Sequence, residues 1–135
     1  MSAFTPAEID YLTSQRLGRL ATVGRSGELH VVPVRFHYDA RLDTIDVTGR
    51  YLGQSKKYRD VQEDARAAFV VDDLAGPGQP RGVEVRGRAE AVPAGGDAIT
   101  PGADPEFIRI TPTRILSWGI DTEPTRPNSR RVHRG

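Results

Sequence analysis

The chain has 135 residues and a net charge of +1, with 37% apolar and 27% charged side chains. A chain of this length can bury a core as one domain, and its composition is that of a folded globular protein. It contains no cysteine, which excludes disulfides, thiolate metal sites and a cysteine nucleophile. We find neither a signal peptide nor an apolar run near the ~20 residues of a membrane helix, so we expect a cytoplasmic protein without a membrane segment.

Positive charge is concentrated at the end of the chain. Residues 122–135 hold four arginines against one glutamate, a net charge of +3, which leaves −2 for residues 1–121. We therefore expect one domain over residues 1–121 and a basic C-terminal tail over residues 122–135. A domain this close to neutral argues against nucleic acid as the main partner, although the arginine-rich tail keeps that alternative open.

The first element predicted is a short helix that runs to about Gln15. Thr5 can cap it, Pro6 suits its first position, and Glu8 completes a capping box. Apolar side chains then recur at helical spacing, which predicts that one face of the helix packs on the core.

Three antiparallel strands are expected next, over residues 18–23, 29–38 and 44–48. The second strand is the longest, and it alternates apolar and polar residues. In the third, Ile45 and Val47 are expected to point inward. The turns between these strands are short, which is typical of a meander.

The second half of the chain predicts a helix over residues 55–63, with Ser55 as its N-cap, and four more strands. Gly87 indicates a bulge or bend, and Pro112 is expected to separate the last two strands. The two loops at residues 74–82 and 93–105 are rich in glycine and proline. The four strands are expected at residues 67–71, 83–92, 107–111 and 114–120.

These elements predict a mainly β protein, with about six or seven antiparallel strands and one or two short helices. An open sheet of this size would expose its edges, so closure into a small barrel is expected.

Residues 48–59 combine a glycine-flanked loop, a helix start and a group of cations. Free N–H groups at a helix start favour an anion, and the cations add charge and hydrogen-bond donors. Lys56 and Lys57 are the only lysines in the chain. We expect a phosphate or a carboxylate tail to bind here; the alternative is an ordinary solvent-facing helix start. The cations are Arg50, Lys56, Lys57 and Arg59.

Arg35 lies in the middle of an apolar strand, where a charge is costly unless it is paired or lies beside a ligand. Pro33 removes a backbone donor, so this strand is expected at an edge or facing something other than a strand. A flat ligand against this backbone would fit both observations; the alternative is a barrel exterior covered by a partner or by solvent. The three histidines have no metal-ligand spacing, and no metal site is expected.

The ordered set of sequence blocks resembles the short actinobacterial members of the pyridoxamine 5′-phosphate oxidase-like superfamily, the split-barrel flavin or deazaflavin (F420) oxidoreductases. The resemblance extends from about Thr5 to Ile120. It rests on the blocks at residues 18–23, 32–36, 49–61, 67–73, 81–90 and 108–119.

The resemblance implies a split β-barrel that forms a homodimer, with a cofactor site in each cleft between subunits. Val32, Pro33, Val34 and Arg35 would line the ring, and Thr48, Gly49 and Arg50 would lie near the ribityl chain. The phosphate and an anionic tail would be held by Ser55, Lys56, Lys57 and Arg59. Trp118 would close the cleft near the dimer contact; a buried tryptophan at the barrel end is the alternative.

The expected function is a coenzyme F420-dependent reductase that transfers a hydride to a small organic acceptor. The chain lacks the C-terminal extension of the vitamin B6 oxidases, and the paired lysines favour F420 over FMN because the F420 tail adds carboxylates. Candidate catalytic residues are Arg35, which would stabilise negative charge, and His37 or Tyr38, which would relay a proton. The alternatives are an FMN-binding oxidase or reductase on the same fold, and a non-catalytic flavin- or tetrapyrrole-binding protein.

Overall fold

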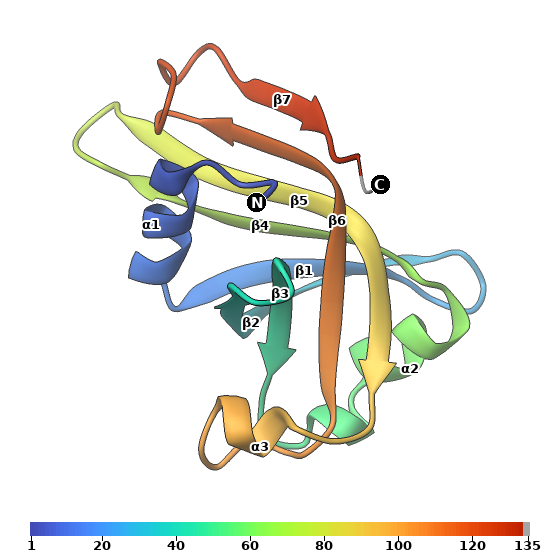
Figure 1. Cartoon of the computed structure of the whole chain (residues 1–135). Helices are drawn as coiled ribbons and strands as arrows, with labels where there is room; N and C mark the ends of the chain where they lie inside the picture. The colour runs from blue at the N-terminus through green and yellow to red at the C-terminus, as the bar shows by residue number, and fades with distance from the viewer. Residues whose placement is uncertain (134–135) are drawn as a thin grey trace.

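A computed structural model describes residues 1–133 of the chain, and Arg134 and Gly135 of the expected tail lie outside the described residues. Seven strands form one antiparallel sheet in the order β3-β2-β1-β4-β5-β6-β7, and β3 also pairs with β6. That extra pairing closes β1 to β6 into a barrel (Figure 1). The strands are β1 (Leu17–Val23), β2 (Leu29–Asp39), β3 (Thr44–Thr48), β4 (Arg66–Leu74), β5 (Pro80–Val92), β6 (Phe107–Trp118) and β7 (Asn128–Arg131).

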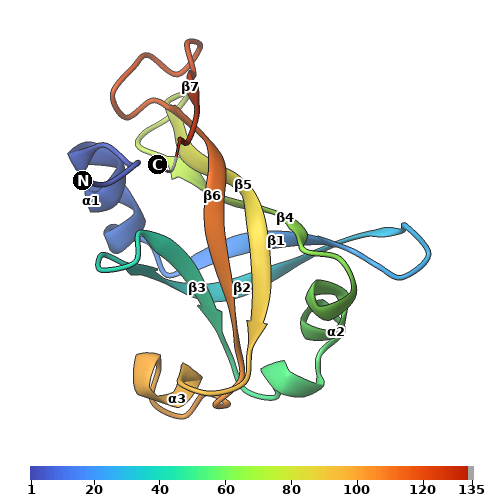
Figure 2. The same ribbon diagram turned by 45° about the vertical axis from the view of Figure 1, so that its right-hand side comes forward.

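Three short helices and a single 3-10 turn lie outside the barrel. Figure 2 shows α1 beside β7 at one end of the molecule, with α2 and α3 toward the other end. The helices are α1 (Pro6–Ser14), α2 (Lys56–Glu63) and α3 (Gly96–Ile99), and the 3-10 turn is Leu52–Gln54. The expected fold class, a mainly β split barrel, is confirmed.

The barrel core forms where the inward-facing side chains of all six strands meet. Alternation places Leu20, Val34 and Phe69 inside, and each is at most 5% exposed. Phe36 meets Phe69 edge to face, with ring centroids 5.0 Å apart. The alternation expected for the long second strand is confirmed, because its odd-numbered residues from 29 to 37 are exposed.

Local sequence signals account for both predicted helices. The Thr5 hydroxyl accepts from the Glu8 N–H, and the Glu8 carboxylate accepts from the Thr5 N–H, which completes the expected capping box. The Ser55 hydroxyl caps α2 by accepting from the Tyr58 N–H.

The loop at residues 93–105 contains α3, a single helical turn that the sequence analysis missed. The expected split of the last strand at Pro112 is wrong, because β6 runs unbroken from Phe107 to Trp118. The register shifts between Arg86 and Gly87, opposite Pro112, so the proline lies at a bulge, where a missing N–H is tolerated. The bulge predicted at Gly87 is confirmed; a Cβ there would lie 2.2 Å from the Thr111 carbonyl oxygen.

The third strand is buried on both faces, whereas only Ile45 and Val47 were expected to point inward. The opposite face carries Asp46, whose carboxylate accepts from Arg109 Nε and Nη2 at 3.0 and 3.1 Å. Because the Arg109 guanidinium pairs with the Asp46 carboxylate in this way, the charged side chain of Asp46 can be buried on the second face of β3.

Part of the basic tail belongs to the sheet. Residues Asn128–Arg131 form β7, which pairs with β6. Arg130 reaches back across the sheet and donates to both carboxylate oxygens of Glu8 and to the Ala3 carbonyl oxygen. Glu8 also accepts from the Ser117 hydroxyl and is fully buried. We call Glu8, Ser117 and Arg130 the terminal clamp, because they fasten the last described strand to the first helix.

Candidate functional site

Three adjoining hollows beside β2 share one residue, Arg35. Their volumes are about 360, 330 and 200 Å³. The first lies over the start of β1 and the 3-10 turn, the second faces the loop after α3, and the third opens toward the end of α1. We refer to the three together as the Arg35 cleft. They are lined by Gln15, Arg16, Leu17, Pro33, Val34, Arg35, Phe36, Thr48, Gly49, Arg50, Leu52, Lys57 and Thr100–Ala103.

Strand register brings the walls of the cleft together. Arg35 pairs with Leu17 of β1 on one side and with Thr48 of β3 on the other. Pro33 lies in the part of β2 that pairs with β1 alone, as expected for a strand edge. Leu17 is 60% exposed, so this part of the cleft offers an apolar surface beside a cation.

The loop after α3 forms the facing wall and is firmly anchored. The Thr48 and Thr100 hydroxyls lie 2.8 Å apart. The Asp104 N–H donates to the Gly49 carbonyl oxygen at 3.0 Å, and the Asp104 carboxylate accepts from the Gly53 N–H at 3.2 Å. The segment that faces Arg35 is therefore held in place by hydrogen bonds from both of its ends.

The charge of the cleft is one-sided. Arg16, Arg35, Arg50 and Lys57 line it, and no aspartate or glutamate does so within the described chain. None of these four cations forms an ion pair with another described residue. Burial lowers the pKa of Lys57, with no carboxylate beside it to offset the effect. An anionic ligand would supply the missing counter-charge.

The two adjacent lysines point to different surroundings. Lys57 lines the cleft, whereas Lys56 binds Asp60 at 3.0 Å and lies 3.6 Å from Glu28. Asp60 is buried and also accepts from the Thr22 hydroxyl, so Lys56 balances a buried carboxylate. Arg59 donates to the Gln54 carbonyl oxygen, and the Ser55 hydroxyl donates to that of Leu52. The structure thus brings Lys57 to the cleft and leaves its neighbours Lys56, Arg59 and Ser55 in local contacts.

The candidate catalytic residues do not lie together. His37 is exposed on the same face of β2 as Arg35, but it lines none of the three hollows. Tyr38 lies on the opposite face and donates to the Asp43 carboxylate at 2.6 Å. Burial and that hydrogen bond raise the pKa of Tyr38. Tyr38 therefore lies on the face of β2 away from Arg35, whereas His37 shares the face of Arg35 and stays a candidate proton relay.

Val32 and Trp118 also lie outside the Arg35 cleft. Val32 packs against the barrel core on the inner face of β2. Trp118 ends β6 and packs across Gly82, where an added Cβ would lie 2.4 Å from the indole ring. Sequence reasoning missed Arg16, Gln15 and Thr100, because they come from connections whose path depends on the tertiary fold.

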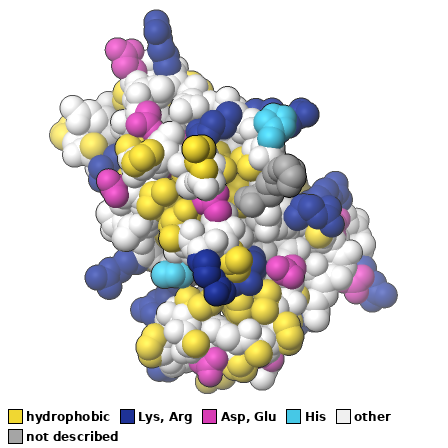
Figure 3. Space-filling view, viewed as in Figure 1, with side chains coloured by type: hydrophobic (Ala, Val, Ile, Leu, Met, Phe, Trp, Pro, Cys, Tyr) yellow, Lys and Arg dark blue, Asp and Glu magenta, His cyan; other side chains and the backbone are white. Residues whose placement is uncertain are grey.

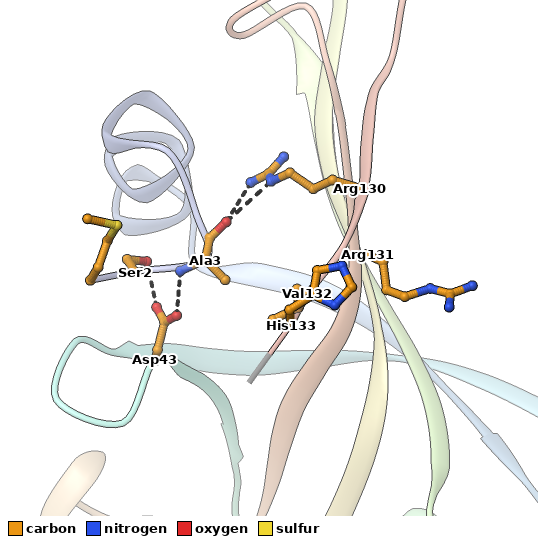
Figure 4. A pocket seen from close by; sticks show the side chains of 8 residues that line it. Ser2, Ala3, Asp43, Arg130, Arg131, Val132 and His133 are labelled. Atoms are coloured by element: carbon orange, nitrogen blue, oxygen red, sulfur yellow. Dashed lines mark hydrogen bonds between the residues drawn. The ribbon is translucent and has the colours of Figure 1, made fainter. Parts of the chain in front are cut away.

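Another hollow, of about 590 Å³, lies between the two ends of the described chain. In Figure 4 the Asp43 carboxylate is already occupied by Ser2 and the Ala3 N–H, and Arg130 points to the Ala3 carbonyl oxygen. Asp43 and Arg130 therefore serve the fold. Among residues 1–133 no group of three or more metal-binding side chains comes together, and no helix is both long and apolar enough to span a membrane.

Charged side chains elsewhere are dispersed. Figure 3 shows Lys and Arg side chains projecting from several parts of the outline, with acidic side chains among them. Ion pairs such as Arg81 with Asp73 and Arg109 with Asp46 balance some of these charges. Others, such as Arg25 and Arg88, form no ion pair with a described residue. The Arg35 cleft differs because four such cations line adjoining hollows.

Comparison with protein families identifies the scaffold: the pyridoxamine 5′-phosphate oxidase model matches residues 4–119. The chain belongs to this family. The expected superfamily is thereby confirmed, and the match covers the whole barrel and the Arg35 cleft.

A curated relative points to the chemistry. The chain is 49% identical over 120 residues to a 5a,11a-dehydrotetracycline/5a,11a-dehydrooxytetracycline reductase from Streptomyces rimosus, across 87% of this chain and 84% of the relative. That relative is a reductase, which supports the expected oxidoreductase class for this family member.

Solved structures confirm the fold. A FAD-binding protein from Mesorhizobium loti has a TM-score of 0.63 at 25% identity, across 87% of this chain and 93% of its own. The FAD-binding protein from Mycobacterium smegmatis has a TM-score of 0.64 at 22% identity, across 98% of this chain and 100% of its own. Both of these proteins, which share this fold, are described as FAD-binding.

The residues of the cleft fit a phosphorylated ring cofactor. Arg50 and Lys57 have no counter-charge among residues 1–133, and they share a hollow with the apolar residues Leu17 and Pro33. A phosphate would take the charged end and a flat ring would lie on the apolar end.

Proposed function

We propose that this chain is a reductase that uses reduced coenzyme F420 and a small organic acceptor. The observation that carries the proposal is the Arg35 cleft, where four cations that have no acidic partner among residues 1–133 adjoin an apolar wall. When bound, the deazaflavin supplies a hydride, which is the chemistry that these side chains lack.

The protein would contribute binding, orientation and charge. Lys57 and Arg50 would hold the phosphate, while Leu17 and Pro33 would support the ring. Arg35, at the junction of the three hollows, would lie close enough to stabilise negative charge that develops on the acceptor. Because no histidine or carboxylic acid lines the cleft in the described chain, water would supply the proton.

The preference for F420 over FMN rests on charge. The F420 tail carries carboxylates in addition to the phosphate, and FMN has only the phosphate. Arg50 and Lys57 are two cations without partners at one end of the cleft, and each exposed contact to an added carboxylate contributes about 0.2–1 kcal/mol. A few such contacts would favour F420 by roughly tenfold.

The acceptor class follows from the relative. The enzyme from Streptomyces rimosus reduces dehydrotetracyclines, according to its name. We propose that this chain likewise reduces an electron-poor carbon–carbon double bond in a polycyclic acceptor, and that it acts in the cytoplasm.

We further propose a homodimer that completes each cleft. Leu29 and Val31, on the outer face of β2, are 80% and 71% exposed. The register extends this apolar surface across the sheet, because Val31 pairs with Ala21 and Ala21 pairs with Ala68. A second copy of the chain that covered this face would bury these side chains. Burial would stabilise the dimer by about 25 cal/mol for each Å² of apolar surface removed from water.

The dimer is tested by sedimentation of the wild-type chain and of a Val31→Asp variant. We expect a dimer for the wild type and a monomer for the variant, with weaker F420 binding in the variant. A monomeric wild type that binds F420 at full strength would contradict the dimer.

The cleft also fits two alternatives. One is an FMN-dependent enzyme, and the other is a binding protein that catalyses no reaction. The test is oxidation of reduced F420 by the purified chain in the presence of dehydrotetracycline-type and quinone acceptors. Turnover with F420 supports the proposal. Tight retention of FMN without affinity for F420 favours the first alternative, and F420 binding without turnover of any acceptor favours the second.

A further inference from the structure

The Arg35 cleft continues past the proposed cofactor position into a hollow of about 200 Å³. It is lined by Gln15, Arg16, Arg35, Phe36 and Thr100. None of Gln15, Arg16 and Thr100 belongs to the expected cofactor contacts. We call this hollow the Arg16 pocket.

The fold places Arg16 where two elements meet. Helix α1 ends at Ser14 and β1 begins at Leu17, so Arg16 lies in a two-residue connection. Because Leu17 pairs with Arg35, the register brings Arg16 beside Phe36. The C-cap residue Gln15 is fixed by a hydrogen bond from its N–H to the Leu12 carbonyl oxygen, so the connection is anchored at its start.

The two guanidiniums in this pocket lack counter-charges. Some arginines of the barrel are paired, such as Arg19 with Asp72 at 2.5 Å and Arg81 with Asp73 at 2.7 Å, whereas Arg88 forms no ion pair with a described residue and lines none of the three hollows. Arg16 and Arg35 form no ion pair with any residue of the described chain. Two like charges that share a small pocket repel each other unless an anion lies between them.

The remaining walls are suited to a flat molecule. Phe36 is a partly exposed aromatic residue of the pocket lining whose ring also packs edge to face on Phe69, and Thr100 is held by its hydroxyl contact with Thr48 at 2.8 Å. A planar acid could therefore lie against Phe36 while its oxygens face the arginines, whose planar forks match such oxygens in a bidentate way.

We propose that the Arg16 pocket is the acceptor subsite and that it selects planar acceptors with an ionised oxygen acid, such as an enolate, a phenolate or a carboxylate. Arg16 is the specificity-determining residue of this subsite. The assignment of the bound molecule as the acceptor rests on the proposed function.

Selection of an acceptor with an ionised oxygen suits the proposed reduction of a carbon–carbon double bond. Hydride addition to a carbon–carbon double bond conjugated with a carbonyl moves the π pair onto the carbonyl oxygen and forms an enolate, which water then protonates on carbon. The reduced deazaflavin is the two-electron donor and is oxidised in the same step. Arg35 lines both the cofactor part of the cleft and the Arg16 pocket, so it can face that oxygen while Arg16 holds the acid already present.

The test measures binding of two probes of the same shape, 2-naphthoate and 2-naphthamide, by calorimetry at low salt without cofactor. The proteins are the wild type, Arg16→Gln and the control Arg41→Gln, which changes an exposed arginine in the β2–β3 turn. We expect the wild type and the control to bind naphthoate at least tenfold more tightly than naphthamide. The Arg16→Gln variant should lose most of this preference and keep its midpoint of chemical denaturation.

Equal binding of the two probes by the wild type, or an unchanged preference in Arg16→Gln, overturns the proposal. A parallel F420 titration separates this result from the proposed function. If the wild type selects naphthoate but does not bind F420, the anion subsite stands and the F420 assignment fails. If F420 binds without any probe preference, the anion subsite fails and the cofactor assignment stands.

Discussion

At the terminal clamp Arg130 is paired with Glu8, whereas in the Arg35 cleft Arg35 and Arg50 have no acidic partner in the part of the chain that the structure describes. Arg130 lies 2.5 Å from one oxygen of the buried Glu8 carboxylate and 3.1 Å from the other. The same side-chain chemistry thus fastens the fold in one place and leaves a charge ready for a ligand in the other. This difference predicts that changes at the clamp alter stability and changes in the cleft alter binding.

The largest expected effect is at the clamp. A Glu8→Gln variant removes the charge that balances Arg130, and breaking one side of a buried ion pair costs about 3–5 kcal/mol. Urea denaturation followed by circular dichroism measures the loss in the free energy of unfolding. F420 affinity under folding conditions should change less than twofold, and a loss of affinity without a loss of stability would reverse the roles assigned to the two regions.

The next effect concerns the cleft. An Arg50→Gln variant should weaken F420 binding by about 10- to 100-fold, since a hydrogen bond to a charged group contributes roughly 1.5–3 kcal/mol. Its free energy of unfolding should stay within about 0.5 kcal/mol of the wild type, because Arg50 is exposed and unpaired. Calorimetric titration and urea denaturation give the two numbers, and unchanged affinity would place the phosphate elsewhere.

The adjacent lysines provide a matched comparison. Lys57→Ala should weaken F420 binding several-fold with little change in stability. Lys56→Ala should leave binding nearly unchanged and lower the free energy of unfolding, because it removes the cation beside the buried Asp60. Equal losses of binding in both variants would mean that Lys56 leaves Asp60 to contact the cofactor.

The smallest expected effect near neutral pH is the change in stability that results from protonation of Glu8 in the terminal clamp. Burial alone would raise the pKa of Glu8, but hydrogen bonds from Arg130, Ser117 and the Thr5 N–H lower it below its usual value of 4.5. Because the folded pKa is lower than the unfolded one, the stabilisation is fully present above about pH 4.5 and is lost as the pH falls through the folded value. Denaturation between pH 7 and pH 3 should show the wild type and Glu8→Gln converging at the acid end; a constant difference would contradict this pKa direction.

Much of the fold was predictable because its signals are local. The Thr5–Glu8 capping box, the Ser55 cap and the bulge at Gly87 each depend on residues close in the chain or on one backbone requirement. The break expected at Pro112 failed because a proline at a bulge leaves the strand intact, a fact that depends on the partner strand.

The site was less predictable than the fold. The sequence pointed to Arg35, Gly49, Arg50 and Lys57, and the structure brings these residues together. The i,i+4 spacing of Lys56 and Asp60 allows an ion pair within the predicted helix, but the sequence analysis did not use it. It also gave no sign that Arg16 and Thr100, which are more than 80 residues apart in the sequence, line one pocket with Arg35. A pattern of cations can propose a site, but only the fold shows which of them already have partners.

The central claim is that the unpaired cations of the Arg35 cleft bind the phosphate and anionic tail of F420. The most direct measurement is a calorimetric titration of F420 and FMN into the wild type, Arg50→Gln and Glu8→Gln. The account predicts that the wild type binds F420 more tightly than FMN, that Arg50→Gln loses this preference, and that folded Glu8→Gln keeps it. Equal or tighter binding of FMN by the wild type, or full F420 affinity in Arg50→Gln, would contradict the account.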